Sequence, residues 1–76
     1  MMKKMRELYW YLIQAAIFSD MGISTRELLA LTGVSRTTLI KRLNEIADRG
    51  MLKTNRNGKE KYYQIDLIAL ESLRDF

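Results

Sequence analysis

The chain has 76 residues and a formal net charge of +4. It contains no cysteine and no histidine, which excludes disulfides, thiol nucleophiles, the common zinc sites and histidine acid–base catalysis. No stretch approaches the roughly 20 apolar residues that a membrane-spanning helix needs. We therefore expect one domain over residues 1–76, with no cofactor, no metal and no membrane segment.

The positive charge is concentrated in one part of the chain. Residues 36–61 carry eight basic and three acidic side chains, a net charge of +5, whereas the remainder carries five basic and six acidic ones, a net charge of −1. Such a patch is the electrostatic footprint of a polyanionic partner. The alternative is a solvated surface that is basic by chance, and composition alone does not decide between the two.

Residues 1–21 predict a first helix, from about residue 3 to residue 20, with Gly22 as its C-terminal cap. A surface helix in a small domain needs one apolar stripe, which Leu12, Ala16 and Tyr9 can supply. Several apolar side chains are left over: Trp10, Tyr11, Ile17 and Phe18. A second copy of the chain is the simplest cover for them, and packing of the C-terminal segment against them is the alternative.

The N-terminus resembles a secretory signal peptide superficially, because Lys3, Lys4 and Arg6 precede an apolar run. That run contains three aromatic residues, and residues 19–21 are not a small-x-small cleavage motif. We interpret it as a helix of a cytoplasmic, nucleoid-associated protein.

Residues 24–49 predict two helices joined by a tight turn. Ser24 and Glu27 form a capping box for the second helix, residues 25–31, in which Leu28 and Leu31 face inward. Gly33 supplies the positive φ that the connection between the helices needs.

The third helix is capped by Ser35 and ended by Gly50. Its inner face carries residues at i, i+4 and i+7, which are Leu39, Leu43 and Ile46. The same spacing places a polar row on the opposite face, which consists of Thr37, Lys41 and Asn44. Glu45 is expected to pair with Lys41 and with Arg49.

Residues 51–65 predict a β hairpin. The first strand covers residues 51–55, the Asn57-Gly58 pair is a strong turn signal, and residues 60–65 form the return strand. Tyr63 and Ile65 share one face of that strand, and Tyr62 and Gln64 share the other. Residues 66–76 then predict a last helix, capped by Asp66, which is too short to be stable alone and is expected to pack on the first helix.

This order is typical of a winged helix-turn-helix, a mainly α fold with a small β hairpin. Three helices are followed by the hairpin and a fourth helix. A very short strand at Ile23 is compatible with this fold. The segments ISTRELLALTGVSRTTL (23–39), LNEIADRGML (43–52) and RNGKEKYYQI (56–65) resemble the helix-turn-helix and wing of bacterial and archaeal winged-helix regulators. They are similar to the MarR and ArsR groups and to the N-terminal DNA-binding domain of the biotin repressor. The metal ligands of the ArsR group and the longer helices around a MarR ligand pocket are missing.

The resemblance implies binding to double-stranded DNA, and position on the predicted elements assigns a role to each side chain. Ser35 offers the amides of a helix N-terminus to a phosphate, and Arg36 can contact a guanine or a phosphate. The outward row of the third helix can recognise base edges, its flanks can contact phosphates, and the wing tip can reach a minor groove or the backbone. Ile40 either contacts a thymine methyl group or packs on the second helix, which we favour. The predicted DNA-binding set is Thr25, Arg26, Ser35, Arg36, Thr37, Thr38, Lys41, Arg42, Asn44, Lys53, Arg56, Asn57, Lys59 and Lys61.

Dimerisation through the first and last helices would present two third helices to successive major grooves. The predicted dimer interface consists of Trp10, Tyr11, Ile17, Phe18, Leu70 and Leu73. The sequence thus predicts a transcriptional regulator without an effector domain. The alternative function is a protein–protein adaptor or a subunit of a larger nucleoprotein complex, but an adaptor would not need the polar row and basic wing. An enzyme would need a carboxylate cluster or a nucleophile–base pair, and the acidic residues are scattered.

Overall fold

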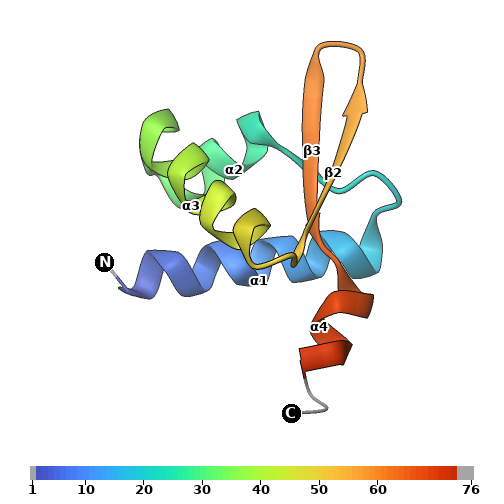
Figure 1. The fold of residues 1–76 in the computed structure, drawn as a ribbon. Helices are drawn as coiled ribbons and strands as arrows, with labels where there is room; N and C mark the ends of the chain where they lie inside the picture. The colour runs from blue at the N-terminus through green and yellow to red at the C-terminus, as the bar shows by residue number, and fades with distance from the viewer. Residues whose placement is uncertain (1, 74–76) are drawn as a thin grey trace.

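A computed structural model describes residues 2–73, with side chains placed for residues 7–71. The elements follow in the order α1 (Met2–Phe18), β1 (Ile23–Ser24), α2 (Thr25–Thr32), α3 (Arg36–Asp48), β2 (Leu52–Asn57), β3 (Glu60–Ile65) and α4 (Leu67–Leu73) (Figure 1). The three strands form one antiparallel sheet in the order β1-β3-β2. This arrangement confirms the predicted winged-helix fold, including the short strand at Ile23.

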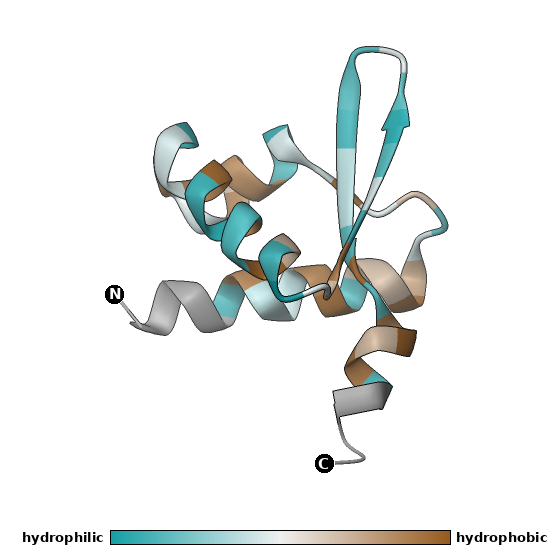
Figure 2. Cartoon of the chain, viewed as in Figure 1, coloured by the Kyte–Doolittle hydropathy of each residue, from teal (hydrophilic) through white to brown (hydrophobic). Residues whose placement is uncertain are grey.

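The core lies where α1, α2, α3 and the root of the hairpin meet. Its largest fully buried side chains come from all three helices and are Leu12, Leu28, Leu39, Leu43 and Ile46. The inner row predicted for α3 is therefore confirmed. Figure 2 shows the result: apolar segments turn toward one another between the helices, and polar segments cover the hairpin and the outer side of α3.

The segment between α1 and β1 differs from the prediction. The helix ends at Phe18, so Gly22 is not its cap, and the prediction for Gly22 was wrong. Gly22 has a φ of 106°, and a Cβ atom on it would lie 2.6 Å from the carbonyl oxygen of Tyr63. A glycine is required here because the backbone passes directly against β3, in a conformation that residues with a Cβ rarely adopt.

Ser24 is confirmed as the N-cap of α2, which is one half of the predicted capping box, but one of the predicted inward residues is not confirmed. The Glu27 amide donates a hydrogen bond to Ser24 Oγ at 3.1 Å. Leu28 is fully buried, whereas Leu31 is 49% exposed, so the prediction that Leu31 faces the core was wrong. Thr32 faces the core in its place, because its hydroxyl donates to the Leu28 carbonyl at 2.6 Å and so carries no unsatisfied polar group into the interior.

The hairpin turn is shifted by one residue from the predicted position. Asn57 pairs with Glu60, so the two-residue loop is Gly58-Lys59 and not Asn57-Gly58. Gly58 has a φ of 64°, and a glycine in the first position of such a loop is the pattern of a type II′ turn. The shift lengthens β2 to Asn57 and brings Arg56 directly opposite Lys61.

α4 begins at the predicted cap. Asp66 Oδ1 accepts hydrogen bonds from the amides of Ile68 and Ala69 at 3.0 and 3.2 Å. Leu67 and Ile68 line a shallow hollow together with Ala16 of α1. Within residues 2–73, no helix combines the length and apolar character needed to cross a membrane.

The close contact at Gly22 predicts a large stability loss for Gly22→Ala. The new Cβ would collide with the Tyr63 carbonyl, and the positive φ would be strained as well, so the free energy of unfolding should fall by roughly 2 kcal/mol or more. Gly50→Ala is the matched control, since Gly50 also has a positive φ but nothing lies within 4 Å of the added Cβ. It should lose only the conformational part, about 1–2 kcal/mol. Urea unfolding measures both, and equal losses would contradict the role given to the backbone contact.

Candidate nucleic-acid interface

The start of α3 is fixed by its own cap. Ser35 is extended, with φ −69° and ψ 156°, and its Oγ accepts a hydrogen bond from the Thr38 amide at 3.2 Å. The same hydroxyl donates to Thr38 Oγ1 at 2.9 Å. Both side chains are exposed and hold the first turn in place, so Arg36 projects from a defined position at the N-terminus of the helix.

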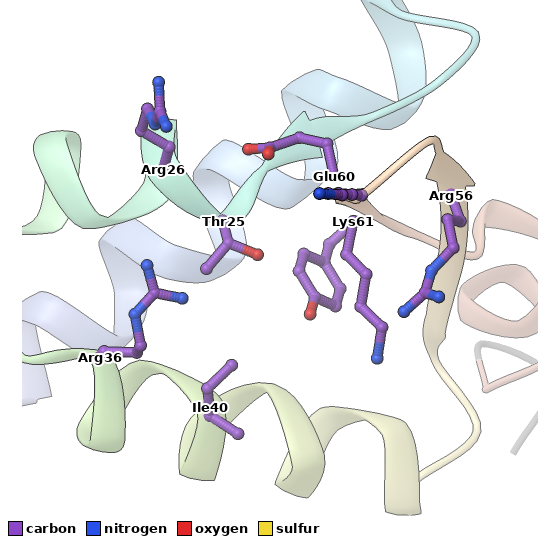
Figure 3. A pocket seen from close by; sticks show the side chains of 9 residues that line it. Thr25, Arg26, Arg36, Ile40, Arg56, Glu60 and Lys61 are labelled. Atoms are coloured by element: carbon purple, nitrogen blue, oxygen red, sulfur yellow. The ribbon is translucent and has the colours of Figure 1, made fainter.

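A groove lies between the start of α2, the first turns of α3 and the hairpin, which we call the wing. Its volume is about 280 Å³. Six of the predicted DNA-binding side chains meet in it, namely Thr25, Arg26, Arg36, Arg56, Lys59 and Lys61. Figure 3 shows Arg36 of α3 on one wall of the groove and Arg56 and Lys61 of the wing on the other.

The groove is strongly basic, and its cations have no ionic partners among the side chains of residues 7–71. Its lining includes five basic side chains and a single acidic one, Glu60, which gives a formal balance of +4. Among the side chains of residues 7–71, the one ion pair joins Arg42 and Glu45, which lie outside the groove lining. The groove therefore offers several unpaired charges of one sign to a polyanion.

Two of these cations face each other across the wing. Arg56 and Lys61 are directly opposite in the antiparallel pairing of β2 and β3. Like charges in such a position repel and destabilise the sheet. Figure 3 shows that both side chains extend into the groove. The fold thus tolerates an unfavourable pair at the place where a bound anion would relieve it.

The outward row of α3 is exposed beside the groove. Thr37, Lys41 and Asn44 are all exposed and contribute nothing to the core. The core residue Leu39 and its neighbours fix the opposite face of the helix, so the row is held outward by packing and needs no partner of its own.

The ion pairs predicted along α3 are wrong. Glu45 pairs with Arg42, whose Nη1 lies 3.2 Å from both carboxylate oxygens, and not with Lys41 or Arg49. Arg49 instead donates to the hydroxyl of Tyr9 on α1 at 3.2 Å. Lys41 is left free to face outward, whereas Arg42 is held along the flank of the helix.

The structure separates two of the predicted wing residues from the groove. Successive side chains of a strand point to opposite faces, so Lys53 and Asn57 lie on the face of β2 away from Arg56. Lys53 is paired with Gln64 and lines the hollow beside Ala16 of α1. Residues 53 and 56 are an odd number of positions apart, so the sequence alone places their side chains on opposite faces of a strand.

Three groove residues were not among the predicted DNA-binding set. Ile40 packs partly against the core and also lines the groove, which agrees with the packing that we favoured for it. Tyr63 is 6% exposed and closes the groove where the wing meets the core. Glu60, the acidic member, follows the loop directly. No sequence signal marked Tyr63, because its role depends on which face of β3 turns toward α3.

The side chains of the groove do not resemble a metal site. Across residues 7–71, no three His, Cys, Asp or Glu side chains are grouped so that they could hold a metal ion. The groove lining instead combines guanidinium and ammonium groups with one threonine hydroxyl, and these groups suit phosphate oxygens.

A helix-turn-helix with an exposed polar row, beside a basic groove formed with a wing, defines the class of winged-helix transcriptional regulator domains. Comparison with known families agrees with this class. Residues 13–66 match the family described as "Transcriptional regulator DIP2311-like, C-terminal domain", and the chain belongs to that family. The match runs from the middle of α1 to Asp66 and so includes α2, α3 and the whole wing. None of the curated proteins compared with the chain matched it.

The repulsion between Arg56 and Lys61 predicts that Lys61→Glu stabilises the fold. The new carboxylate would attract the Arg56 guanidinium, so the free energy of unfolding should rise by roughly 0.2–1 kcal/mol at low salt. High salt should erase most of the gain, because exposed charges are screened. Urea unfolding at two salt concentrations tests this, with Lys61→Gln expected between wild type and Lys61→Glu. A loss of stability in Lys61→Glu at low salt would contradict the proposed repulsion.

Proposed function

We propose that the protein is a sequence-specific double-stranded DNA-binding protein that acts as a transcriptional regulator. The observation that carries the proposal is the groove, with five basic side chains and no ionic partner for any of them within the described residues. The repulsive cross-strand pair of Arg56 and Lys61 in the groove supports a polyanion as the partner, because a bound anion would relieve the repulsion. The family of transcriptional regulator domains supports the same function.

The side chains divide into two roles in this proposal. A major groove is about 12 Å wide and admits one helix, and the exposed row Thr37, Lys41 and Asn44 would meet base edges there. Arg36 at the first turn would contact a guanine or the adjacent phosphate. The cations of the groove would hold the phosphate backbone that passes between α3 and the wing. Lys53 is excluded from this surface, and Arg42 joins it only if its pair with Glu45 opens.

We propose that the chain resembles MarR and ArsR regulators and the biotin repressor domain, and that α3 is the helix that enters the DNA. We infer a binding role rather than catalysis for the described residues. A protein–protein adaptor is the alternative function, and the exposed side chains at the end of α1 favour it. Phe18 is 82% exposed and Leu31 is 49% exposed, and both line a hollow between α1 and α2. An adaptor role would not explain why five basic side chains lie in the groove without ionic partners among the described residues.

Salt dependence and a pair of lysine variants test DNA binding. The logarithm of the affinity for a fluorescent DNA duplex should fall linearly with the logarithm of salt concentration, since bound phosphates release counterions. Lys61→Ala should weaken binding and reduce the slope by about 0.9. Lys53→Ala is the matched control on the opposite face of the wing, and it should leave the slope nearly unchanged. A flat salt response in the wild type would favour the adaptor, and equal effects of the two variants would contradict the assignment of the face.

We also propose that the protein is a homodimer that uses the apolar surface of α1. Trp10 and Ile17 are more than half exposed, at 57% and 58%, and Phe18 is more so. Tyr11 and Leu70 are poorer candidates than the sequence indicated, because both pack partly against the domain's own core. The side chain of Leu73 lies outside the described residues.

Sedimentation at micromolar concentration tests the dimer. The wild type should sediment as a species of twice the 8.9 kDa chain mass. Phe18→Ser should shift it toward the monomer without loss of secondary structure, because Phe18 contributes little to the domain's own core. Asp20→Ser, an exposed polar site two residues away, is the control and should remain dimeric. A wild type that sediments only at the monomer mass would exclude this interface.

A further inference from the structure

Two amide side chains tie the root of the wing to the end of α1. Gln64 Nε2 donates hydrogen bonds to the main-chain carbonyls of Ala15 and Ser19, at 3.3 and 3.2 Å. Asn55 Nδ2 donates to the Met21 carbonyl at 2.7 Å and to Gln64 Oε1 at 3.0 Å. We call Asn55 and Gln64 together the amide clamp. It joins both strands of the wing to three successive points on the helix end and the following loop.

We infer that the amide clamp sets the angle of the wing relative to the three helices, and that it thereby positions the wing cations for DNA binding. Asn55 and Gln64 are positioning residues, since neither lines the groove. The consequence for DNA rests on the proposed function, whereas the effect on the wing angle does not.

The hydrogen bonds of the amide clamp favour a role in orienting the wing over a role in attaching it alone. On the side of β3 that faces α3, the root of the wing is held by the buried side chains Tyr63 and Ile65. On the side that faces α1, Gln64 is just as deeply buried, at 5% exposed, yet it is polar. Apolar contact is non-directional, whereas hydrogen bonds lose strength steeply with angle. Three bonds to main-chain carbonyls outside the wing therefore restrict its tilt in a way that apolar side chains of equal size would not.

The wing needs such a constraint because it has little other support. Its side chains from Lys53 to Lys59 are exposed except for the half-buried Asn55. A two-stranded ribbon is marginally stable by itself in water. Figure 1 shows that the outer part of β2 and β3 extends away from the helices, so the attachment at the root decides where the tip lies.

The same attachment reaches the other wall of the groove. The loop that the clamp holds passes into β1, where Ile23 and Ser24 pair with Tyr63 and Tyr62 of β3. Ser24 then caps α2, whose first residues Thr25 and Arg26 line the groove. The clamp therefore fixes the wing against the segment that places the start of α2, and it controls the separation of cations on the two walls.

A distance measurement without DNA tests the inference directly. The chain has no cysteine, so spin labels can be attached at Asn57→Cys in the wing and Ala30→Cys on the exposed side of α2. Electron–electron resonance should give a broader or displaced distance distribution in Gln64→Met than in the labelled parent. Thr32→Val is the control, because it removes a buried hydrogen bond of 2.6 Å that does not involve the wing. It should lower stability and leave the distribution unchanged.

Asn55→Ala keeps the test decisive if Gln64→Met does not fold. Asn55 is half-buried, so water can replace its bonds, and the fold should survive its loss. A displaced or broader distribution in Asn55→Ala supports the clamp. An unchanged distribution in a folded clamp variant overturns it, because the wing would then keep its angle without these bonds.

A double-mutant cycle tests the consequence for DNA. Lys59→Ala should weaken binding of a fluorescent DNA duplex by the wild type. In the Asn55→Ala background, the fold-loss caused by Lys59→Ala should shrink by about twofold or more, because a misplaced tip already makes poorer contact. The Thr32→Val background should keep the full loss. Equal fold-losses in all backgrounds overturn the positioning role while DNA binding stands. Absence of salt-dependent DNA binding by the wild type overturns the proposed function instead, and the spin-label distances still decide on the clamp.

Discussion

β3 is hydrogen-bonded along both of its edges, to β1 on one side and to β2 on the other, and it is packed on both of its faces at its C-terminal end. This double constraint holds the remaining elements in place. One face of its root closes the three-helix core, and the other receives the end of α1 through Gln64. The glycine-mediated contact of the α1–β1 loop with Tyr63 adds a third attachment. In a domain this small, a single strand that is held from every side replaces the larger core that a longer chain would build.

The outer part of the wing, in contrast to the root of β3, is not held by packing. Most of its side chains are exposed. Arg56 and Lys61 face each other across the two strands, where most other residue pairs would give a more stable sheet. If the groove binds a polyanion as proposed, stability and binding are separated along one hairpin: the last residues of β3 pack in the core, and the residues around the loop contact the partner. α3 is divided in the same way around its circumference, with a buried row on one side and an exposed polar row on the other.

The sequence predicted most of the fold because its signals are local. Ser24, Ser35 and Asp66 mark helix starts through bonds to amides two or three residues away, and Gly33 marks its turn through its own backbone. Some predictions failed because the answer depends on a distant neighbour. Gly22 was assigned to the nearest helix, although its constraint comes from Tyr63.

The candidate site was predictable in composition and less so in geometry. The basic segment identified Arg36, Arg56 and Lys61, but their convergence depends on the register of the hairpin and on the direction in which β3 leaves the core. The one-residue shift of the loop could not be foreseen, because Asn-Gly and Gly-Lys are both acceptable two-residue loops and tertiary packing chooses between them. The sequence placed Gln64 with Tyr62 on the face of β3 opposite Tyr63 and Ile65, and only the position of α1 shows that Gln64 is covered on that face.

The facing cations of the wing have a consequence for the lifetime of the protein. A polyanion that binds the folded domain and neutralises Arg56 and Lys61 stabilises that state by mass action, while the free domain retains the repulsion. Proteolysis of small domains often depends on the population of opened molecules. Protein molecules bound to DNA, as proposed, would therefore be cleaved by proteases more slowly than free molecules. The number of DNA sites that the protein occupies would then influence its steady-state amount.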